Sequence, residues 1–284
     1  MPELPEVEVL VRQLRPLLLE KFISGVEVRR LRIIRPTAVA KFKRALMRAT
    51  IGSLNRRGKY LLFELKTRGS NSKRLLVGHL GMTGRMYLLP THLPLPKHAA
   101  VVLRLGSEQF VFEDVRYFGR LTLETDALKR LGPEPLGPEF TVEEFRRGLA
   151  RSAQPIKVKL LDQSLVAGIG NIYASEALFR ARLSPRTAAR KLTARQVKLV
   201  WRAIRETLSE AIEFGSTVPL DFAGLSGADQ IFYYGSIPGQ SSYEERLRVY
   251  DREGEACVRC RSRIRRIVQG ARSTFYCPNC QRPG

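Results

Sequence analysis

The chain has 284 residues, enough for two domains that each bury a core of their own. Its 49 lysines and arginines against 27 aspartates and glutamates give a formal net charge of +22. This charge predicts a polyanionic partner, and it favours nucleic acid over a membrane surface because no basic amphipathic helix stands out. No apolar run of about 18 residues occurs, so we expect no membrane span, and nothing at the start resembles a secretion signal.

The chain begins Met1-Pro2-Glu3-Leu4-Pro5-Glu6, and this start offers a nucleophile. A proline at position 2 normally permits removal of Met1, which leaves the secondary amine of Pro2 free. An α-amino group has a pKa near ~8, so part of it is neutral at physiological pH and can attack an electrophilic carbon to give an iminium. The alternative is an ordinary proline-rich start with a solvated acidic turn.

A helix is predicted directly after this start. Pro5 suits its first position, and Pro16 and the pair Ser24-Gly25 mark its end. Apolar residues follow with the i, i+3, i+4, i+7 spacing of one buried face: Val7, Leu10, Val11, Leu14 and Leu18.

Short β-rich runs dominate from there to about residue 125, with one predicted helix over 39–48. The runs are 60–65, 75–80, 85–89, 99–105, 109–115 and 120–124. Six or more closely spaced strands favour an antiparallel sandwich or barrel. The proline- and glycine-rich run 131–138 then predicts a linker.

The second half is predicted to be helical. Thr141 and Glu144 form a capping box before a helix that ends at Ala150. Further helices are expected over 155–162, from Asn171, and over 193–214, where Trp201 lies on the core face.

A Gly168-x-Gly170 turn precedes the helix that starts at Asn171. Glycines permit a tight turn, and the free N–H groups of a helix start suit a phosphate. With Lys157 and Lys159 nearby in sequence, we expect a clamp for the DNA backbone here.

All four cysteines lie near the end of the chain, as Cys257, Cys260, Cys277 and Cys280. Two Cys-x2-Cys pairs at this separation predict one tetrahedral zinc site, whereas two disulfides would need an oxidising compartment. The residues between the pairs predict a β-hairpin that presents guanidinium groups to phosphates: Arg261, Arg263, Arg265, Arg266 and Arg272. Residues 224–243 are expected to form a long exposed loop.

Five segments together resemble bacterial formamidopyrimidine-DNA glycosylases, in that family's order and over the whole chain. They are 2–6, 56–62, 79–82, 168–176 and the four cysteines. The resemblance implies an α+β multidomain fold with an N-terminal antiparallel β-sandwich and flanking helices, a helix-two-turn-helix domain and a β-hairpin zinc finger. The implied boundaries are 1–130 for the catalytic domain, 131–140 for a linker, 141–223 for the helical domain, 224–248 for a lesion-side loop and 249–284 for the finger.

The resemblance also implies an activity. Such an enzyme excises oxidised purines, such as 8-oxoguanine and formamidopyrimidines, through a Schiff base on the N-terminal proline, and then cleaves the strand by β,δ-elimination. We therefore expect a monomer with one structural Zn²⁺ that acts on double-stranded DNA holding oxidised bases or abasic sites, in the cytoplasm of a bacterium, at the nucleoid.

Residue by residue, the resemblance assigns four catalytic positions. Pro2 looks like the nucleophile, Glu3 like the acid/base for the sugar ring oxygen, and Glu6 like a supporting carboxylate. Lys59 matches a lysine that reaches the target phosphate and base; without the family it would be interpreted as a solvated strand edge.

Further positions match DNA-binding residues. His79, Asn171, Tyr250 and Arg272 are assigned to the DNA backbone. Met82, Arg116 and Phe118 match a trio that fills the gap left by a flipped base, although Met82 and Phe118 in isolation would be predicted to lie in the core. His92 and His98 are expected at the surface.

The chain departs from the family pattern at one segment, and two alternative functions remain. The family usually has Asp-Pro-Arg-Arg-Phe-Gly where this chain has Asp114-Val115-Arg116-Tyr117-Phe118-Gly119, so we expect altered contacts to the base opposite the lesion. A related branch that acts on oxidised pyrimidines typically has glycine at the position of Leu4, which favours the purine enzyme. A zinc-dependent protein that binds damaged DNA without catalysis remains a third hypothesis.

Overall fold

The β-rich runs form two antiparallel sheets in a computed structural model, which describes residues 2–67, 70–215 and 247–282. The described residues divide into two units. The first contains Pro2 and Glu6–Lys129, and the second contains Glu3–Pro5 and the described residues from Arg130 onward. The loop predicted at 224–243 lies outside the described residues.

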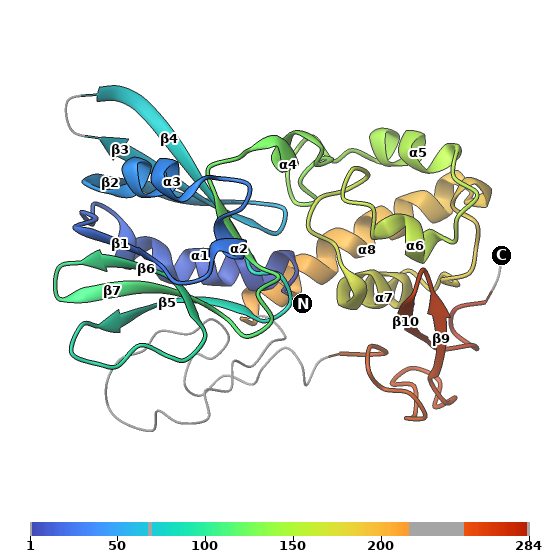
Figure 1. Ribbon diagram of the computed structural model, residues 1–284. Coiled ribbons are helices and arrows are strands. Elements are labelled where there is room, and N and C mark those ends of the chain that lie inside the picture. The colour runs from blue at the N-terminus through green and yellow to red at the C-terminus, as the bar shows by residue number, and fades with distance from the viewer. Residues whose placement is uncertain (1, 68–69, 216–246, 283–284) are drawn as a thin grey trace. The chain divides into compact units, whose positions relative to one another are not determined.

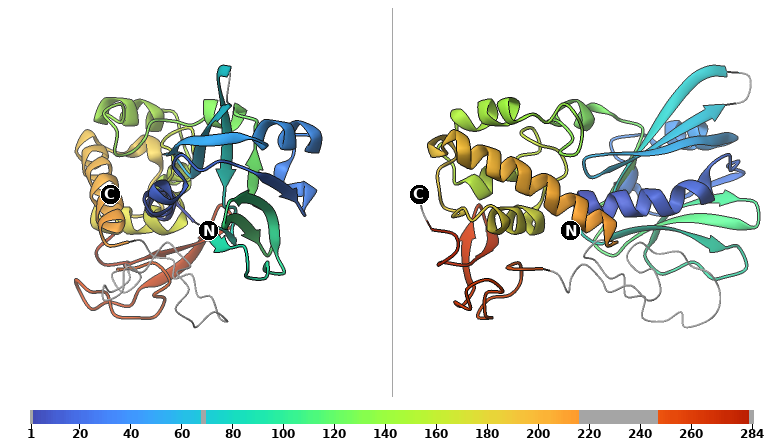
Figure 2. Two further views of the ribbon diagram at one scale, coloured as in Figure 1. Left: turned by 90° about the vertical axis from the view of Figure 1, so that its left-hand side faces the viewer. Right: turned by 180° about the vertical axis from the view of Figure 1, so that it is seen from behind.

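The two four-stranded sheets of the first unit face each other, which confirms the predicted sandwich (Figures 1 and 2). One has the order β1-β6-β7-β5, with bounds Gly25–Val28, Ala99–Leu105, Glu108–Asp114 and Gly84–Pro90. The other has the order β2-β3-β4-β8, with bounds Ala49–Arg57, Tyr60–Thr67, Ser70–His79 and Arg120–Thr122. Two of these strands were not predicted: β1, which is short, and β2, which carries polar residues on its outer face.

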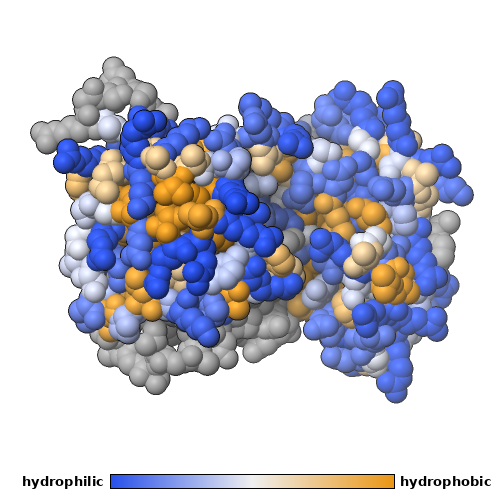
Figure 3. All heavy atoms as spheres, viewed as in Figure 1, coloured by the Kyte–Doolittle hydropathy of each residue, from blue (hydrophilic) through white to orange (hydrophobic). Residues whose placement is uncertain are grey.

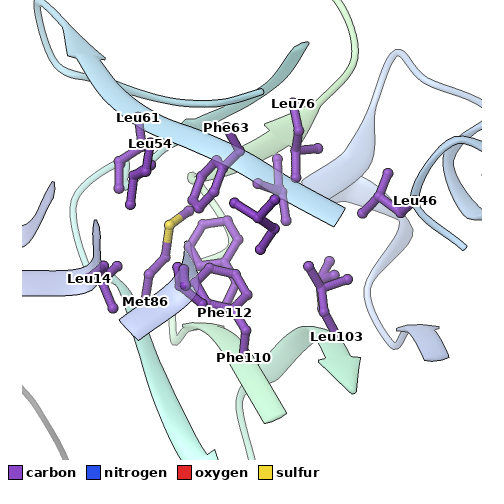
Figure 4. Packing of buried hydrophobic residues seen from close by; sticks show 14 of the residues in the cluster. Leu14, Leu46, Leu54, Leu61, Phe63, Leu76, Met86, Leu103, Phe110 and Phe112 are labelled. Atoms are coloured by element: carbon purple, nitrogen blue, oxygen red, sulfur yellow. The ribbon is translucent and has the colours of Figure 1, made fainter. Parts of the chain in front are cut away.

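Side chains from both sheets fill the space between them (Figure 4). Phe63 of β3 meets Phe110 of β7 edge-on with ring centroids 5.7 Å apart. Helix α1, Leu4–Leu18, buries Leu14 and Leu18 in the same core. It continues through Pro16, so the predicted end at this proline is wrong. Pro16 has no N–H to donate within the helix, and burial of Leu18 in the core offsets this cost.

Three shorter helices complete the first unit. They are α2, Leu31–Ile34, α3, Val39–Leu46, and α4, Asp126–Lys129. The predicted helix over 39–48 is confirmed by α3, which buries Phe42 and Leu46.

Four helices of the second unit confirm the helices predicted there. Their bounds are Val142–Ala150 for α5, Ile156–Leu160 for α6, Asn171–Arg180 for α7 and Ala194–Glu213 for α8, with a 3-10 turn, η1, at Ala189–Lys191. The Thr141 hydroxyl accepts from the Glu144 N–H at 3.2 Å and so caps α5. Trp201 is half-buried against the core, and its Nε1 donates to the Phe140 carbonyl at 2.7 Å.

The C-terminal hairpin pairs β9, Arg265–Gln269, with β10, Arg272–Tyr276, as predicted. Helix α7 fixes the segment that leads into it. The buried Glu176 carboxylate accepts from the backbone N–H groups of Arg248, Val249 and Tyr250 at 3.0, 2.9 and 2.8 Å. Burial raises the pKa of Glu176, and these three hydrogen bonds oppose the rise.

Hydrophilic residues cover most of the face shown in Figure 3, with an apolar area over α2 and α3. In α2, Leu31 is 55% exposed. Within the described ranges, no helix is both long and apolar enough to cross a membrane.

Candidate functional site

The carboxylate of Glu3 lies at the start of α7. It accepts hydrogen bonds from the backbone N–H groups of Gly170, Ile172 and Tyr173 at 2.7, 2.9 and 3.3 Å. Glu3 is only 2% exposed. A negative charge is favoured at this end of a helix, because the unpaired N–H groups and the helix dipole are both positive there. The Glu3 side chain is therefore held in one position.

Two glycines let the chain start approach α7 this closely. Gly168 has a φ of +89°, and a Cβ there would lie 2.6 Å from the Cβ of Leu4. A Cβ on Gly170 would lie 2.3 Å from the carboxyl carbon of Glu3. These glycines were predicted to open N–H groups to a phosphate, and this prediction is wrong: the groups bind Glu3 instead.

Three predicted DNA-binding residues of the second unit lie around a buried lysine. Lys157, fully buried, donates from Nζ to Asn171 Oδ1 and to the Ser273 carbonyl. Asn171 Nδ2 donates to the same carbonyl at 2.9 Å, and the side chain of Asn171 is also hydrogen-bonded to Tyr250. Arg272 begins β10 and is exposed. The structure thus gathers Asn171, Tyr250 and Arg272 on one side of the unit that holds Glu3.

Lys157 is close to losing its positive charge at physiological pH. Burial lowers its pKa to about 8, with Arg272 adding to the fall and Glu3 opposing it. Lys157 is therefore mostly a cation at pH 7 and loses that charge at mildly alkaline pH. The sequence named this residue as one of several basic groups near a turn, but nothing in its local pattern indicates that it is buried beside a carboxylate.

A second basic cluster lies in the first unit. Lys59, 7% exposed, lies in the turn between β2 and β3. His79 lies at the end of β4, and burial lowers its pKa to about 4, with Lys59 and Arg120 adding to the fall. His79 Nδ1 accepts from the Gly81 N–H at 3.0 Å, so the neutral ring carries its proton on Nε2. That N–H is a donor suited to a phosphate oxygen.

The predicted trio comes from two loops of the first unit that pack against each other. Met82 and Phe118 are 44% and 42% exposed, and Arg116 is also exposed. The core location that the apolar character of Met82 and Phe118 alone would predict is therefore wrong. At Gly81, which has a φ of +63°, a Cβ would lie 2.6 Å from the Gly119 nitrogen, so glycine permits this contact between the loops.

A buried aspartate organises these loops, and the sequence analysis assigned it no role. Asp114 Oδ1 accepts from the Thr83 hydroxyl at 2.6 Å and from the Arg116 N–H at 3.1 Å, and Oδ2 accepts from the Gly119 N–H at 2.7 Å. Its position at the end of a strand and before a glycine-ended turn was the available signal.

The remaining positions that were predicted to be catalytic are both buried in the first unit. Pro2 directly precedes Glu3 in the chain, and Glu6 lies in the first turn of α1. Met1 lies outside the described residues.

The four cysteines form one site for a structural zinc ion. Their sulfur atoms all lie within 4.8 Å of one another, with Cys257 to Cys280 at 3.9 Å and Cys260 to Cys277 at 3.4 Å. Tetrahedral ligands at Zn–S of ~2.3 Å would be separated by ~3.8 Å, whereas a disulfide needs ~2.05 Å. All four are free thiols, so the disulfide alternative is wrong.

Three family models match the chain. The formamidopyrimidine-DNA glycosylase N-terminal domain matches residues 1–121, and the formamidopyrimidine-DNA glycosylase H2TH domain matches residues 131–221. A zinc finger found in FPG and IleRS matches residues 254–283.

Whole proteins are similar over the same length. A formamidopyrimidine-DNA glycosylase of Thermus thermophilus is 44% identical over 292 residues, covering 100% of both chains. A Lactococcus lactis FPG mutant, solved with DNA containing Fapy-dG, is 33% identical with a TM-score of 0.86, covering 99% of this chain and 100% of that one. The wild-type Lactococcus lactis protein, solved with DNA containing an oxidised pyrimidine, is 32% identical with the same TM-score and coverage.

We expect Gly170→Ala to destabilise the second unit. The added Cβ would displace the Glu3 carboxylate, whose loss leaves buried N–H groups of α7 unpaired, at about 1–3 kcal/mol. Urea unfolding measures the change. Gly137→Ala is the matched control, because a Cβ there meets its neighbours at 3.4 Å, an ordinary contact. Equal stability of the two variants would contradict the close approach.

Stability is expected to fall as pH falls from about 6.5 to about 4, in part through His79. The unfolded chain takes up a proton at this residue in that window and the folded chain does not, so the free energy of unfolding rises with pH there. Urea unfolding at several pH values should show a shallower dependence for His79→Gln and the wild-type dependence for the exposed His92→Gln. An unchanged slope in His79→Gln would exclude the buried neutral ring.

Metal analysis should find about one zinc per chain, since one tetrahedral site is present. Cys257→Ser should lose the metal and loosen the hairpin, seen as loss of protection from proteolysis. Val258→Ala is the control, because this neighbour is 52% exposed and offers no ligand atom. Full zinc content in Cys257→Ser would contradict the four-cysteine site.

Proposed function

Because the chain belongs to the formamidopyrimidine-DNA glycosylase family, we propose that it excises oxidised purines from duplex DNA and then cleaves the strand. The observation that carries the proposal is the Glu3 carboxylate, which α7 holds directly next to Pro2 in the chain. Binding to DNA alone would have no need of a carboxylate fixed beside a secondary amine.

The proposed chemistry uses the amine of Pro2, freed by removal of Met1. Its lone pair attacks C1′ of the damaged nucleoside, and the bond from C1′ to the base breaks with the base taking up a proton. The Glu3 carboxylate first takes a proton from the ammonium form of Pro2, and the neutral amine's remaining proton goes to the departing base. Glu3 then delivers its proton to the ring oxygen, the bond from C1′ to that oxygen opens, and an iminium remains on Pro2.

The iminium then drives strand cleavage. It acidifies the C2′ proton, whose removal by a base expels the 3′ phosphate, and a second elimination expels the 5′ phosphate. Glu6 would support the amine from the first turn of α1, and Lys59 would reach the target phosphate and base.

DNA would be held by the two basic clusters. Asn171, Tyr250 and Arg272 would bind phosphates from the second unit, and Lys157 would orient Asn171. His79 would donate its Nε2–H to a phosphate from the first unit. Met82, Arg116 and Phe118 would fill the gap left by the flipped base, a role that suits the exposed apolar side chains of Met82 and Phe118.

The organisation that we propose follows the predicted boundaries: a catalytic domain at 1–130, a linker at 131–140, a helical domain at 141–223, a loop at 224–248 and a finger at 249–284. We also propose that the protein acts as a monomer.

Oxidised pyrimidines are the second candidate substrate, because a relative of similar fold has been solved with such DNA. Leu4 supports the purine assignment. It is fully buried in the core of the second unit, and its N–H donates to the Gly168 carbonyl at 3.0 Å. A glycine, as in the pyrimidine branch, would leave that place empty.

Borohydride reduction should trap a covalent adduct with duplexes that contain 8-oxoguanine, because hydride converts the iminium to a stable amine. A chain with two extra residues ahead of Pro2 should give almost no adduct, since its proline nitrogen is an amide. The same extension at the C-terminus is the control and should trap normally.

The same assay on thymine glycol duplexes ranks the substrates. Faster trapping with thymine glycol than with 8-oxoguanine would favour the pyrimidine hypothesis. Tight binding without an adduct on any lesion would favour the non-catalytic hypothesis, and normal trapping by the extended chain would exclude Pro2 as nucleophile.

A further inference from the structure

Tyr117 lies between Arg116 and Phe118 but does not share their exposure. It is half-buried against the core of the first unit. Its φ is +54°, a left-handed conformation that side-chain-bearing residues rarely adopt. This backbone conformation turns the Tyr117 side chain away from the direction of the Arg116 and Phe118 side chains. Such a conformation persists only where surrounding contacts maintain it.

Two partners hold the ring of Tyr117. The guanidinium of Arg30 lies over it, 5.3 Å from its centroid. A hydrogen bond of 3.2 Å joins its hydroxyl to His98 Nδ1, and the two rings lie 6.2 Å apart. His98, expected at the surface, is half-buried in this contact. The Tyr117 ring is therefore engaged by contacts within the protein, and the altered contacts to the base opposite the lesion stay a prediction.

Phe118 is held in a similar way. Arg32 and Arg116 lie over its ring at 5.5 and 5.0 Å from the centroid. Arg30 and Arg32 flank the start of α2, so one short segment supplies a cation to each of the two aromatic rings. Asp114 fixes the backbone on either side of this turn through Arg116 and Gly119.

We propose that Tyr117 is a positioning residue for base-gap filling: clamped by Arg30 and His98, it holds Arg116 and Phe118 in the orientation in which they enter the helix stack. This inference rests on the proposed function. An exposed aromatic residue on a short loop would otherwise sample several positions, and ordering it at the moment of insertion would slow insertion. The clamp supplies that order before DNA arrives.

The test uses a duplex with a stable abasic analogue and 2-aminopurine in the opposite strand, whose fluorescence reports insertion without any chemistry. We expect Tyr117→Phe to slow the fluorescence change about fivefold, the effect of one lost neutral hydrogen bond. Tyr117→Ala should slow it by more than about tenfold, since the cation contact is lost as well. Tyr87→Phe is the control, because it removes another buried hydroxyl bond of the same unit, to Glu113 at 2.9 Å.

A second substrate separates positioning from folding and from catalysis. A single-stranded abasic oligonucleotide needs no gap filling, so its cleavage should be unchanged in Tyr117→Phe and Tyr117→Ala. A wild-type insertion rate in Tyr117→Ala would overturn the proposal. So would a fall in the rate of single-strand cleavage as large as the fall in the rate of insertion into the duplex. Failure of the wild-type protein to cleave a duplex with a natural abasic site would reject the proposed function and leave the insertion measurement valid, because the stable analogue requires no cleavage.

Discussion

The interaction on which the site depends is the hydrogen bonding of Glu3 to the start of α7. A helix start is a place where anions bind, and here the anion is supplied by the protein. Three N–H groups fix the carboxylate of Glu3, so Pro2 is covalently attached to a residue whose side chain is held in place. A terminal amine is otherwise among the most mobile groups of a chain. Catalysis at such an amine therefore requires an anchor one residue away, and Gly168 and Gly170 provide the room for it.

The same carboxylate also affects the protonation of the neighbouring Lys157. Lys157 keeps its proton at neutral pH in part because Glu3 opposes the effect of burial. With Lys157 bound to Asn171, the amide of Asn171 is oriented, and Arg272 remains exposed. A phosphate would therefore meet one exposed cation and polar groups already in place, so little ordering would be needed on binding.

Local patterns were sufficient to predict much of this molecule. The apolar spacing of α1 and α8, the strands from β3 to β8 and the cysteine pairs each depend on residues close in sequence, and each was found. Strand β1 was missed because it has only four residues and its partner β6 lies far along the chain. Strand β2 pairs with the adjacent β3 and was missed because polar residues on its outer face obscure the strand pattern. The N–H groups of α7 were assigned to a phosphate because the competing ligand, Glu3, is more than 160 residues away. Burial of Lys157 is likewise a property of the assembled unit, with no local signal.

Met82 and Phe118, which we propose fill the gap left by a flipped base, depart from the usual burial of apolar side chains. Their apolar character predicts a core, yet both are more than 40% exposed. Single exposed apolar side chains are common on protein surfaces, and a rigid loop keeps such a side chain from folding back onto the nearest apolar surface. Asp114 bonds the ends of one loop, Gly81 seats the other against it, and the Tyr117 ring locks the turn from within. An arginine in place of Tyr117 would lengthen the side chain and leave His98 without its hydroxyl partner, so in this chain the stiffness of the loop depends on the aromatic residue.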